Sequence, residues 1–159
     1  MTQYSPAGLS TDALVIGILG GTGDQGRGLA RRLAMAGQSV IIGSRDAARA
    51  SAAASDLGGG RLLAGAVNQE AAEHADVVIA AMPWEGHQDL LASLAGPLAG
   101  KIVVDCVNPM GFDSRGAYPI RVPEGSAAEQ AAAVLPDSTH QLTTQRKPCA
   151  HDHHRPPTH

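Results

Sequence analysis

The fold of this chain is decided by Val15-Ile16-Gly17-Ile18-Leu19-Gly20-Gly21-Thr22-Gly23-Asp24-Gln25-Gly26-Arg27-Gly28. Its first part, residues 15–19, is apolar without alternation, which is typical of a parallel strand covered on both faces. The segment that follows carries Leu29, Leu33 and Ala36 at helical spacing. A strand, a Gly-x-Gly-x-x-Gly turn and a helix in this order predict the phosphate-binding turn of a dinucleotide-binding domain.

Each glycine of this turn has an expected role. Gly21 permits the tight turn, and Gly23 lets a pyrophosphate approach the backbone. Gly26, with Gly28 as a second candidate, allows the helix to pack closely on the strand. The phosphates would lie at the positive end of the helix. The expected donors are the hydroxyl of Thr22 and the amides of Gly23, Asp24 and Gln25. The alternative is an ordinary strand-to-helix turn whose glycines are incidental.

The second predicted strand, residues 39–43, is followed by Ser44 and Arg45. A site for NAD usually carries a carboxylate here, which pairs with the ribose 2′-hydroxyl and repels a 2′-phosphate. Arg45 instead offers a planar guanidinium to a 2′-phosphate, Ser44 adds a donor, and Arg49 adds a second cation. The pattern predicts NADP rather than NAD. Two alternatives stay open: both arginines are solvated surface residues, or Asp46, expected to cap the next helix, is the missing acid displaced by two positions.

The rest of the chain alternates between apolar runs and helical patterns. We therefore predict an α/β fold, a Rossmann-like doubly wound parallel sheet with right-handed crossovers. The predicted strands are residues 13–19, 39–43, 61–67, 76–81 and 101–106. The predicted helices are residues 24–36, 47–57, 69–74, 85–94 and 125–135. The segment 107–123, in which Gly and Pro are scattered, is expected to be irregular.

Composition divides the chain into three parts. We expect residues 1–12 to form a flexible leader, residues 13–136 to form the NADP-binding domain, and residues 137–159 to form a tail. The tail holds five of the seven histidines and almost no large apolar side chain beyond Leu142. Such a segment does not bury enough surface to offset its ordering entropy, so we expect it to be disordered.

The composition excludes several classes of function. A net charge of −3 and four aromatic side chains among 159 residues provide neither a basic surface nor stacking platforms for nucleic acid. No apolar run approaches the length of a membrane span, and the leader lacks the apolar region of a signal peptide. The two cysteines, Cys106 and Cys149, have no metal or redox spacing. We therefore expect a cytoplasmic protein that binds neither nucleic acid nor a membrane.

Two further loops follow predicted strands at the edge where ligands bind in open α/β sheets. Met82, Pro83 and Trp84 follow the fourth strand and are candidates for a wall beside the nicotinamide. The alternative is that Pro83 and Trp84 simply begin the next helix. Asn108 and Pro109 follow the fifth strand and are candidates to contact the nicotinamide ribose or amide.

Other residues with reactive side chains are not expected to act in catalysis. His87 is expected to be a satisfied surface histidine, and Cys106 a small buried hydrophobe rather than a nucleophile. The tail residues Cys149, His151, His153 and His154 form at most a weak chelating tract, so no metal site is predicted. Hydride transfer between two bound cofactors needs positioning rather than an acid, a base or a nucleophile, so we predict no catalytic side chain.

Several segments, taken together, closely resemble the coenzyme F420-dependent NADP oxidoreductases. They are residues 18–30, residues 41–45, and Met82-Pro83-Trp84-Glu85; residues 107–112 and 125–129 resemble the actinobacterial branch. The resemblance runs from about residue 13 to residue 138. It implies a cytoplasmic enzyme that transfers a hydride between NADPH and the deazaflavin coenzyme F420.

The resemblance also implies roles for individual residues. In that family Thr22 to Gln25, Ser44, Arg45 and the position of Arg49, often a lysine, hold NADP. The loop at Pro83 and Trp84 flanks the nicotinamide.

The chain departs from this family after residue 135. Family members continue into another strand and a helical C-terminal domain, which completes the deazaflavin site and the usual homodimer contact. Here that continuation is replaced by Thr139-His140-Gln141-Leu142-Thr143-Thr144 and a His/Pro-rich end. We expect a reading frame shifted near Ser138 in a G+C-rich gene, because shifted C-rich codons yield Pro, His, Gln and Arg. An intact frame on resequencing the locus, with no homologous out-of-frame continuation, contradicts this expectation.

This departure leaves two alternative functions and one expected property. The chain is either a truncated NADP-binding module with little or no catalysis, or another NADP-dependent reductase of the same fold, such as one that acts on an imine. Loss of the second domain is expected to expose apolar surface and puts the homodimer in doubt.

Overall fold

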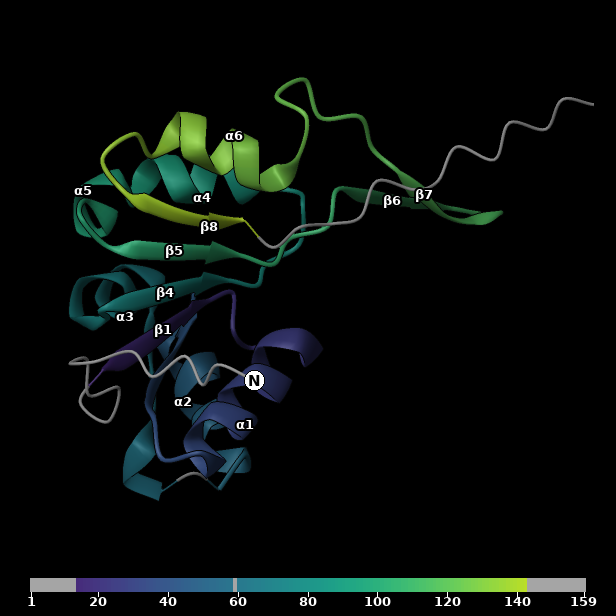
Figure 1. Ribbon diagram of the computed structural model, residues 1–159. Helices are drawn as coiled ribbons and strands as arrows, with labels where there is room; N and C mark the ends of the chain where they lie inside the picture. Colours follow the sequence, from purple (N-terminus) through teal and green to yellow (C-terminus); the bar gives the residue numbers. More distant parts are fainter. Residues whose placement is uncertain (1–13, 59, 143–159) are drawn as a thin grey trace, which may run out of the picture.

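A computed structural model describes residues 14–58 and 60–142, which form one parallel sheet with helices on both faces (Figure 1). The sheet has the strand order β3-β2-β1-β4-β5-β8. Its strands are β1 (Val15–Leu19), β2 (Ser39–Ser44), β3 (Leu63–Val67), β4 (Val77–Ala80), β5 (Ile102–Asp105) and β8 (Thr139–Leu142). The helices are α1 (Asp24–Met35), α2 (Ala47–Asp56), α3 (Asn68–His74), α4 (His87–Ser93), α5 (Ala95–Leu98) and α6 (Ala127–Val134). The predicted Rossmann-like fold is confirmed.

Strand β1 lies in the centre of the sheet, between β2 and β4. Ile18 pairs with Ile42 on one side and with Ile79 on the other. Successive side chains of a strand point to opposite faces, so Ile18 and Leu19, both fully buried, belong to different cores. This explains the absence of alternation, because both faces of β1 are covered.

The two cores contain different sets of elements. Leu19 and Val78 pack with apolar residues of α3 to α6, among them Leu91. Ile18 and Ile42 pack instead with alanines of α1 and α2. The small alanine side chains let the helices approach the sheet closely, and the larger branched residues of the strands fill the space between them.

A few large apolar side chains are exposed. Ile102 of β5 is 40% exposed, whereas its neighbour Val103 is fully buried on the opposite face of the sheet. Met35 and Phe112 are 78% and 77% exposed. Large apolar groups in contact with water favour association with other surfaces.

Strand β8 overturns part of the expectation for the tail. Thr139–Leu142 pairs in parallel with β5, so residues 137–142 are ordered. The Gly100 amide donates to the Asp137 carbonyl at 2.8 Å, and the Thr139 amide donates to the Lys101 carbonyl at 2.9 Å. An edge strand is held by backbone hydrogen bonds. The prediction of a disordered tail considered only apolar side chains and therefore missed this strand. The leader and the rest of the tail, residues 1–13 and 143–159, lie outside the described residues.

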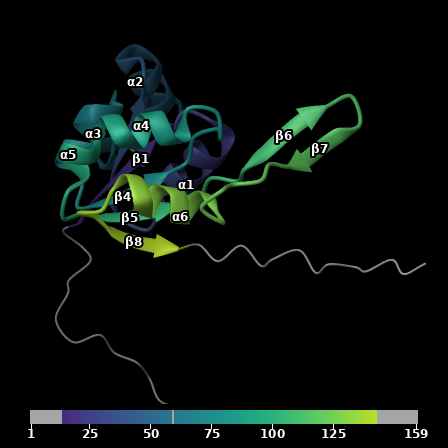
Figure 2. The same ribbon diagram turned by 90° about the horizontal axis from the view of Figure 1, so that it is seen from above.

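A hairpin replaces the irregular segment expected at 107–123. Strands β6 (Met110–Asp113) and β7 (Gly116–Pro119) pair in antiparallel fashion and project from the body of the domain (Figures 1 and 2). Asp113 Oδ1 accepts from the Arg115 amide at 2.8 Å, and Gly116 has a φ of 118°. Asp and Gly at these positions are typical of a tight turn between two strands. The turn was not predicted because Gly and Pro are scattered through the whole segment.

Two glycines of α1 provide a matched test of this packing. A Cβ on Gly26 would lie 2.4 Å from the Gly21 Cα, whereas a Cβ on Gly28 would meet nothing within 4 Å. We expect Gly26→Ala to lower the free energy of unfolding by about 1–3 kcal/mol, because α1 must move off β1. Gly28→Ala should leave it unchanged or raise it by up to about 1 kcal/mol, through helix propensity. Urea unfolding measures both, and equal losses in the two variants would contradict the assigned contact.

Candidate dinucleotide-binding site

The glycine-rich turn lies at the carboxyl end of β1, and its tightest point is Gly20. Gly20 has a φ of 66°, which favours glycine, and a Cβ there would lie 2.7 Å from the Met82 Cβ. The tight turn that the sequence assigned to Gly21 therefore belongs to Gly20. Gly21 is needed for a different reason, since a Cβ there would lie 2.8 Å from the Ile18 carbonyl oxygen.

Helix α1 begins at this turn with backbone amides available to a ligand. Gly23 is its N-cap residue and provides no side-chain cap. The Gly23 amide donates to the Gly20 carbonyl at 3.4 Å, so this predicted donor already has a long hydrogen bond within the turn. Within residues 14–58 and 60–142, the amides of Asp24 and Gln25 have no acceptor. Free amides at a helix N-terminus form an anion-binding site.

The turn is held in place by β2 and by Asn68, a residue that the sequence analysis missed. The Gly21 amide donates to the Gly43 carbonyl at 2.9 Å. The Gly20 amide donates to Asn68 Oδ1 at 3.2 Å, and Asn68 is only 6% exposed. A Cβ on Gly43 would lie 2.7 Å from that same oxygen, so Gly43 makes room for Asn68. A polar first residue of α3, directly after β3, was the available signal.

The end of β2 places Ser44, Arg45 and Arg49 beside this turn. Ser44 is buried, and its Oγ accepts from the Asp46 amide at 3.3 Å. Asp46 caps α2, as the sequence predicted, because its Oδ1 accepts from the Arg49 amide at 3.0 Å. Arg45 and Arg49 are exposed, and neither side chain forms an ion pair with another described residue. Their guanidinium groups are thus available for an external anion.

The loops after β4 and β5 lie at the same edge of the sheet. The Ala81 amide donates to the Leu19 carbonyl at 3.0 Å, and the Cys106 amide donates to the Ala80 carbonyl at 3.0 Å. These bonds align the ends of β1, β4 and β5. The predicted loop residues differ in burial: Met82, Trp84 and Pro109 are half-buried, and Pro83 and Asn108 are exposed.

Trp84 belongs to the loop and not to the helix that follows. Helix α4 begins at His87 after Gly86, which has a φ of 83°, so the alternative of a helix starting at Pro83 is wrong. The Trp84 side chain packs against a small cluster that includes Val107 and Ala127. It therefore joins the loop after β4 to the loop after β5.

His87 is not a surface residue, which corrects the sequence-based expectation. Its side chain is fully buried, and its Nε2 lies 2.8 Å from Asp105 Oδ2. Its Nδ1 lies 3.3 Å from Gln130 Oε1. The imidazole also stacks on Trp84, with ring centroids 5.5 Å apart and 23° between the planes. Sequence periodicity gave no signal for this, because the partners are 18 and 43 positions away.

We refer to His87, Asp105, Gln130 and Glu124 as the His87 network. Gln130 Nε2 donates to the Glu124 carboxylate at 3.4 Å, which directs Gln130 Oε1 towards His87. Both imidazole nitrogens therefore lie within hydrogen-bonding distance of an oxygen atom. Asp105 Oδ1 accepts from the Val107 amide at 2.9 Å.

Cys106, the residue after β5, is a poor nucleophile. It is half-buried, and burial, with a smaller effect of the Asp105 charge, raises the pKa of its thiol above its ordinary value. A raised pKa keeps the sulfur protonated at neutral pH. That no side chain acts in catalysis stays a prediction.

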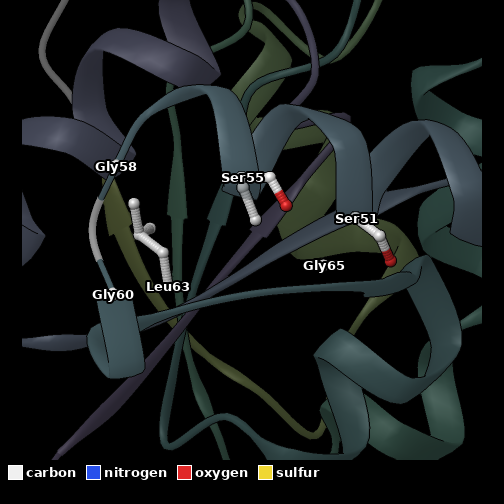
Figure 3. Close-up of a pocket in the computed structure, with 7 residues that line it drawn as sticks. Ser51, Ser55, Gly58, Gly60, Leu63 and Gly65 are labelled. Carbon is white, nitrogen blue, oxygen red and sulfur yellow. The ribbon is translucent and has the colours of Figure 1, made fainter.

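A cavity of about 490 Å³ lies between α2 and the edge strand β3, away from these loops (Figure 3). It is lined by Ser51, Ala54, Ser55, Gly58, Gly60, Leu63 and Gly65. Most of these side chains are small, and none belongs to the predicted cofactor site. The predicted cofactor residues lie instead at the carboxyl edge of the sheet, which is the candidate site.

Two features are absent from the part of the chain that the structure describes. No helix there is long and apolar enough to cross a membrane. No group of three or more possible metal-ligating side chains is found there either. The weak chelating tract considered in the tail lies outside the described residues.

The fold and the loops at its carboxyl edge define a Rossmann-like nucleotide-binding domain. The family described as NADP oxidoreductase, coenzyme F420-dependent, matches residues 15–109. The chain belongs to this family.

Characterised relatives agree with this assignment. The F420-dependent NADP reductase of Methanothermobacter marburgensis is 44% identical over 133 residues, which cover 77% of this chain and 58% of the relative. The F420-dependent NADP reductase of Methanocaldococcus jannaschii is 41% identical over 133 residues and is covered to 59%. A crystal structure described as an F420-dependent NADP-reductase of Arthrobacter sp. FB24 has a TM-score of 0.70 and 30% identity; the match covers 80% of this chain and 61% of that structure. The chain thus spans less than two thirds of these relatives.

Proposed function

We propose that this chain is the NADP-binding part of an oxidoreductase that transfers a hydride between NADPH and the deazaflavin coenzyme F420. The proposal rests on the end of β2, which lies beside the glycine-rich turn. Ser44 and Arg45 occupy the place where a site for NAD usually carries a carboxylate. Family membership connects this site with coenzyme F420.

The proposed cofactor extends along the carboxyl edge of the sheet. Its pyrophosphate binds at the amides of Asp24 and Gln25, with the hydroxyl of Thr22 as a further donor. Its 2′-phosphate binds to Ser44, Arg45 and Arg49, and the guanidinium of Arg45 contributes charge-assisted hydrogen bonds.

The nicotinamide end is proposed to lie between the two remaining loops. Met82, Pro83 and Trp84 form one wall, and Asn108 and Pro109 contact the ribose or the amide. A hydride leaves the reduced nicotinamide and is accepted by the deazaflavin, so the task of the protein is to bring the two rings together and to exclude water. No side chain needs to act as an acid, a base or a nucleophile.

Cellular location and assembly are also proposals. A cytoplasmic location suits two cysteines without disulfide spacing and a cofactor pair that occurs in the cell interior. The resemblance implies a homodimer in the family, whereas the departure of this chain after residue 135 favours a monomer. Light scattering of the purified chain measures the mass that decides between the two.

Turnover distinguishes the enzyme from a binding module. With NADPH and oxidised coenzyme F420 present, we expect steady loss of the deazaflavin absorbance. NADPH binding without this loss of absorbance would instead support a binding module without catalysis. This alternative is tested because the chain spans 58% of its relative from M. marburgensis. Turnover of NADPH with an imine, and none with the deazaflavin, would support a different reductase of the same fold.

Arg45→Glu tests the assignment of the 2′-phosphate. We expect this change to weaken NADPH binding by about 10- to 100-fold and NADH binding much less, because charge-assisted hydrogen bonds are replaced by repulsion. Calorimetric titration gives both dissociation constants. Arg32→Glu, at an exposed position in the last turn of α1, serves as the control for the change of charge. Equal losses for the two cofactors in Arg45→Glu would contradict the assigned role.

A further inference from the structure

We propose that the His87 network positions the loops after β4 and β5 against the nicotinamide half of the cofactor. This inference rests on the proposed function and adds a specific task to residues that do not themselves touch the cofactor. His87, Asp105 and Gln130 are positioning residues in this account.

His87 holds the loop after β4 in two ways. Its imidazole stacks on the Trp84 ring, and its backbone amide donates to the Trp84 carbonyl at 3.1 Å. His87 is itself fixed, because its ring is fully buried and both of its nitrogens have oxygen partners. Trp84 therefore has little freedom to change its rotamer or to move with the loop.

Asp105 connects this arrangement to the loop after β5. One carboxylate oxygen contacts His87 Nε2 at 2.8 Å, and the other accepts from the Val107 amide at 2.9 Å. Val107 directly precedes Asn108 and Pro109, the two candidates for contact with the nicotinamide ribose or amide. A single buried carboxylate thus sets the relative position of the two loops.

The third point of attachment is α6. Gln130 is 6% exposed and is placed by the helix, which begins at its cap residue Ser126. Glu124, which is exposed, fixes the orientation of the Gln130 amide. The network therefore fastens the two loops to α6, which itself packs against α4, β5 and β8.

The adenosine half of the site has separate supports. The glycine-rich turn is held by Gly43 and Asn68, and the end of β2 is held by the Asp46 cap. None of these bonds involves a member of the His87 network. Disruption of the network should therefore affect the nicotinamide half of the cofactor selectively, which a general loss of stability would not do.

The test compares NADPH with adenosine 2′,5′-bisphosphate, which lacks the nicotinamide. Dissociation constants are measured by calorimetric titration of the full 159-residue chain. In His87→Phe, which keeps a planar ring, and in Asp105→Leu, we expect NADPH to bind about tenfold more weakly and the bisphosphate to bind within about twofold of the original chain. Trp84 is the single tryptophan of the chain, so increased acrylamide quenching of its emission reports the loosened loop.

Two control variants sharpen the comparison. Asp105→Asn keeps all of the named hydrogen bonds when His87 is protonated on Nδ1 alone, because the amide nitrogen then donates to Nε2 and the amide oxygen accepts from Val107. We expect it to restore most of the NADPH affinity that Asp105→Leu loses. His74→Phe removes an exposed histidine whose Nδ1 contacts only the Glu70 carbonyl among the described residues, and it should change neither ligand.

Each outcome decides between the alternatives. Equal weakening of both ligands in the loss variants, or no weakening of NADPH, overturns the inference and leaves the proposed function intact. If the original chain binds neither ligand, the proposed function itself fails. Urea unfolding checks the fold of each variant. Gln130→Leu, which removes the 3.3 Å contact to His87 and the 3.4 Å contact to Glu124, is a third loss variant. If none of the three loss variants folds, the network serves stability alone and the inference is wrong.

Discussion

The close approach of α1 to the glycine-rich turn is the constraint on which the rest of the site depends. A Cβ on Gly26 would lie 2.4 Å from the Cα of Gly21, two residues past the end of β1, so a side chain there would push α1 away from the turn. This contact aims the first amides of α1 across the carboxyl edge of the sheet. All other proposed cofactor contacts are arranged around this point, because the neighbouring parallel strands end at the same edge.

The carboxyl edge is built from two halves with independent supports. Backbone hydrogen bonds and the buried amide of Asn68 hold the half formed by β1 and β2. The other half, formed by β4 and β5, is held by a buried imidazole and carboxylate. Such a division lets the domain position the phosphates and the nicotinamide through separate sets of contacts.

Local sequence patterns were enough to predict the central sheet, the glycine-rich turn and the Asp46 cap, because each depends on residues close together in the chain. The burial of His87 was not predictable in this way, since its partners come from β5 and α6. Strand β8 was missed because backbone pairing with β5, and not an apolar side-chain pattern, holds an edge strand. The tight turn was assigned to Gly21 instead of Gly20 because a motif does not reveal which glycine takes a positive φ.

We propose that the carboxyl edge of this sheet binds NADP with the 2′-phosphate at the end of β2. A crystal structure of the chain with NADP⁺ provides the decisive test. We expect the 2′-phosphate within hydrogen-bonding distance of Ser44 and Arg45, and the pyrophosphate within hydrogen-bonding distance of the Asp24 and Gln25 amides. A 2′-phosphate directed into solvent, or a nucleotide bound elsewhere on the domain, would contradict it.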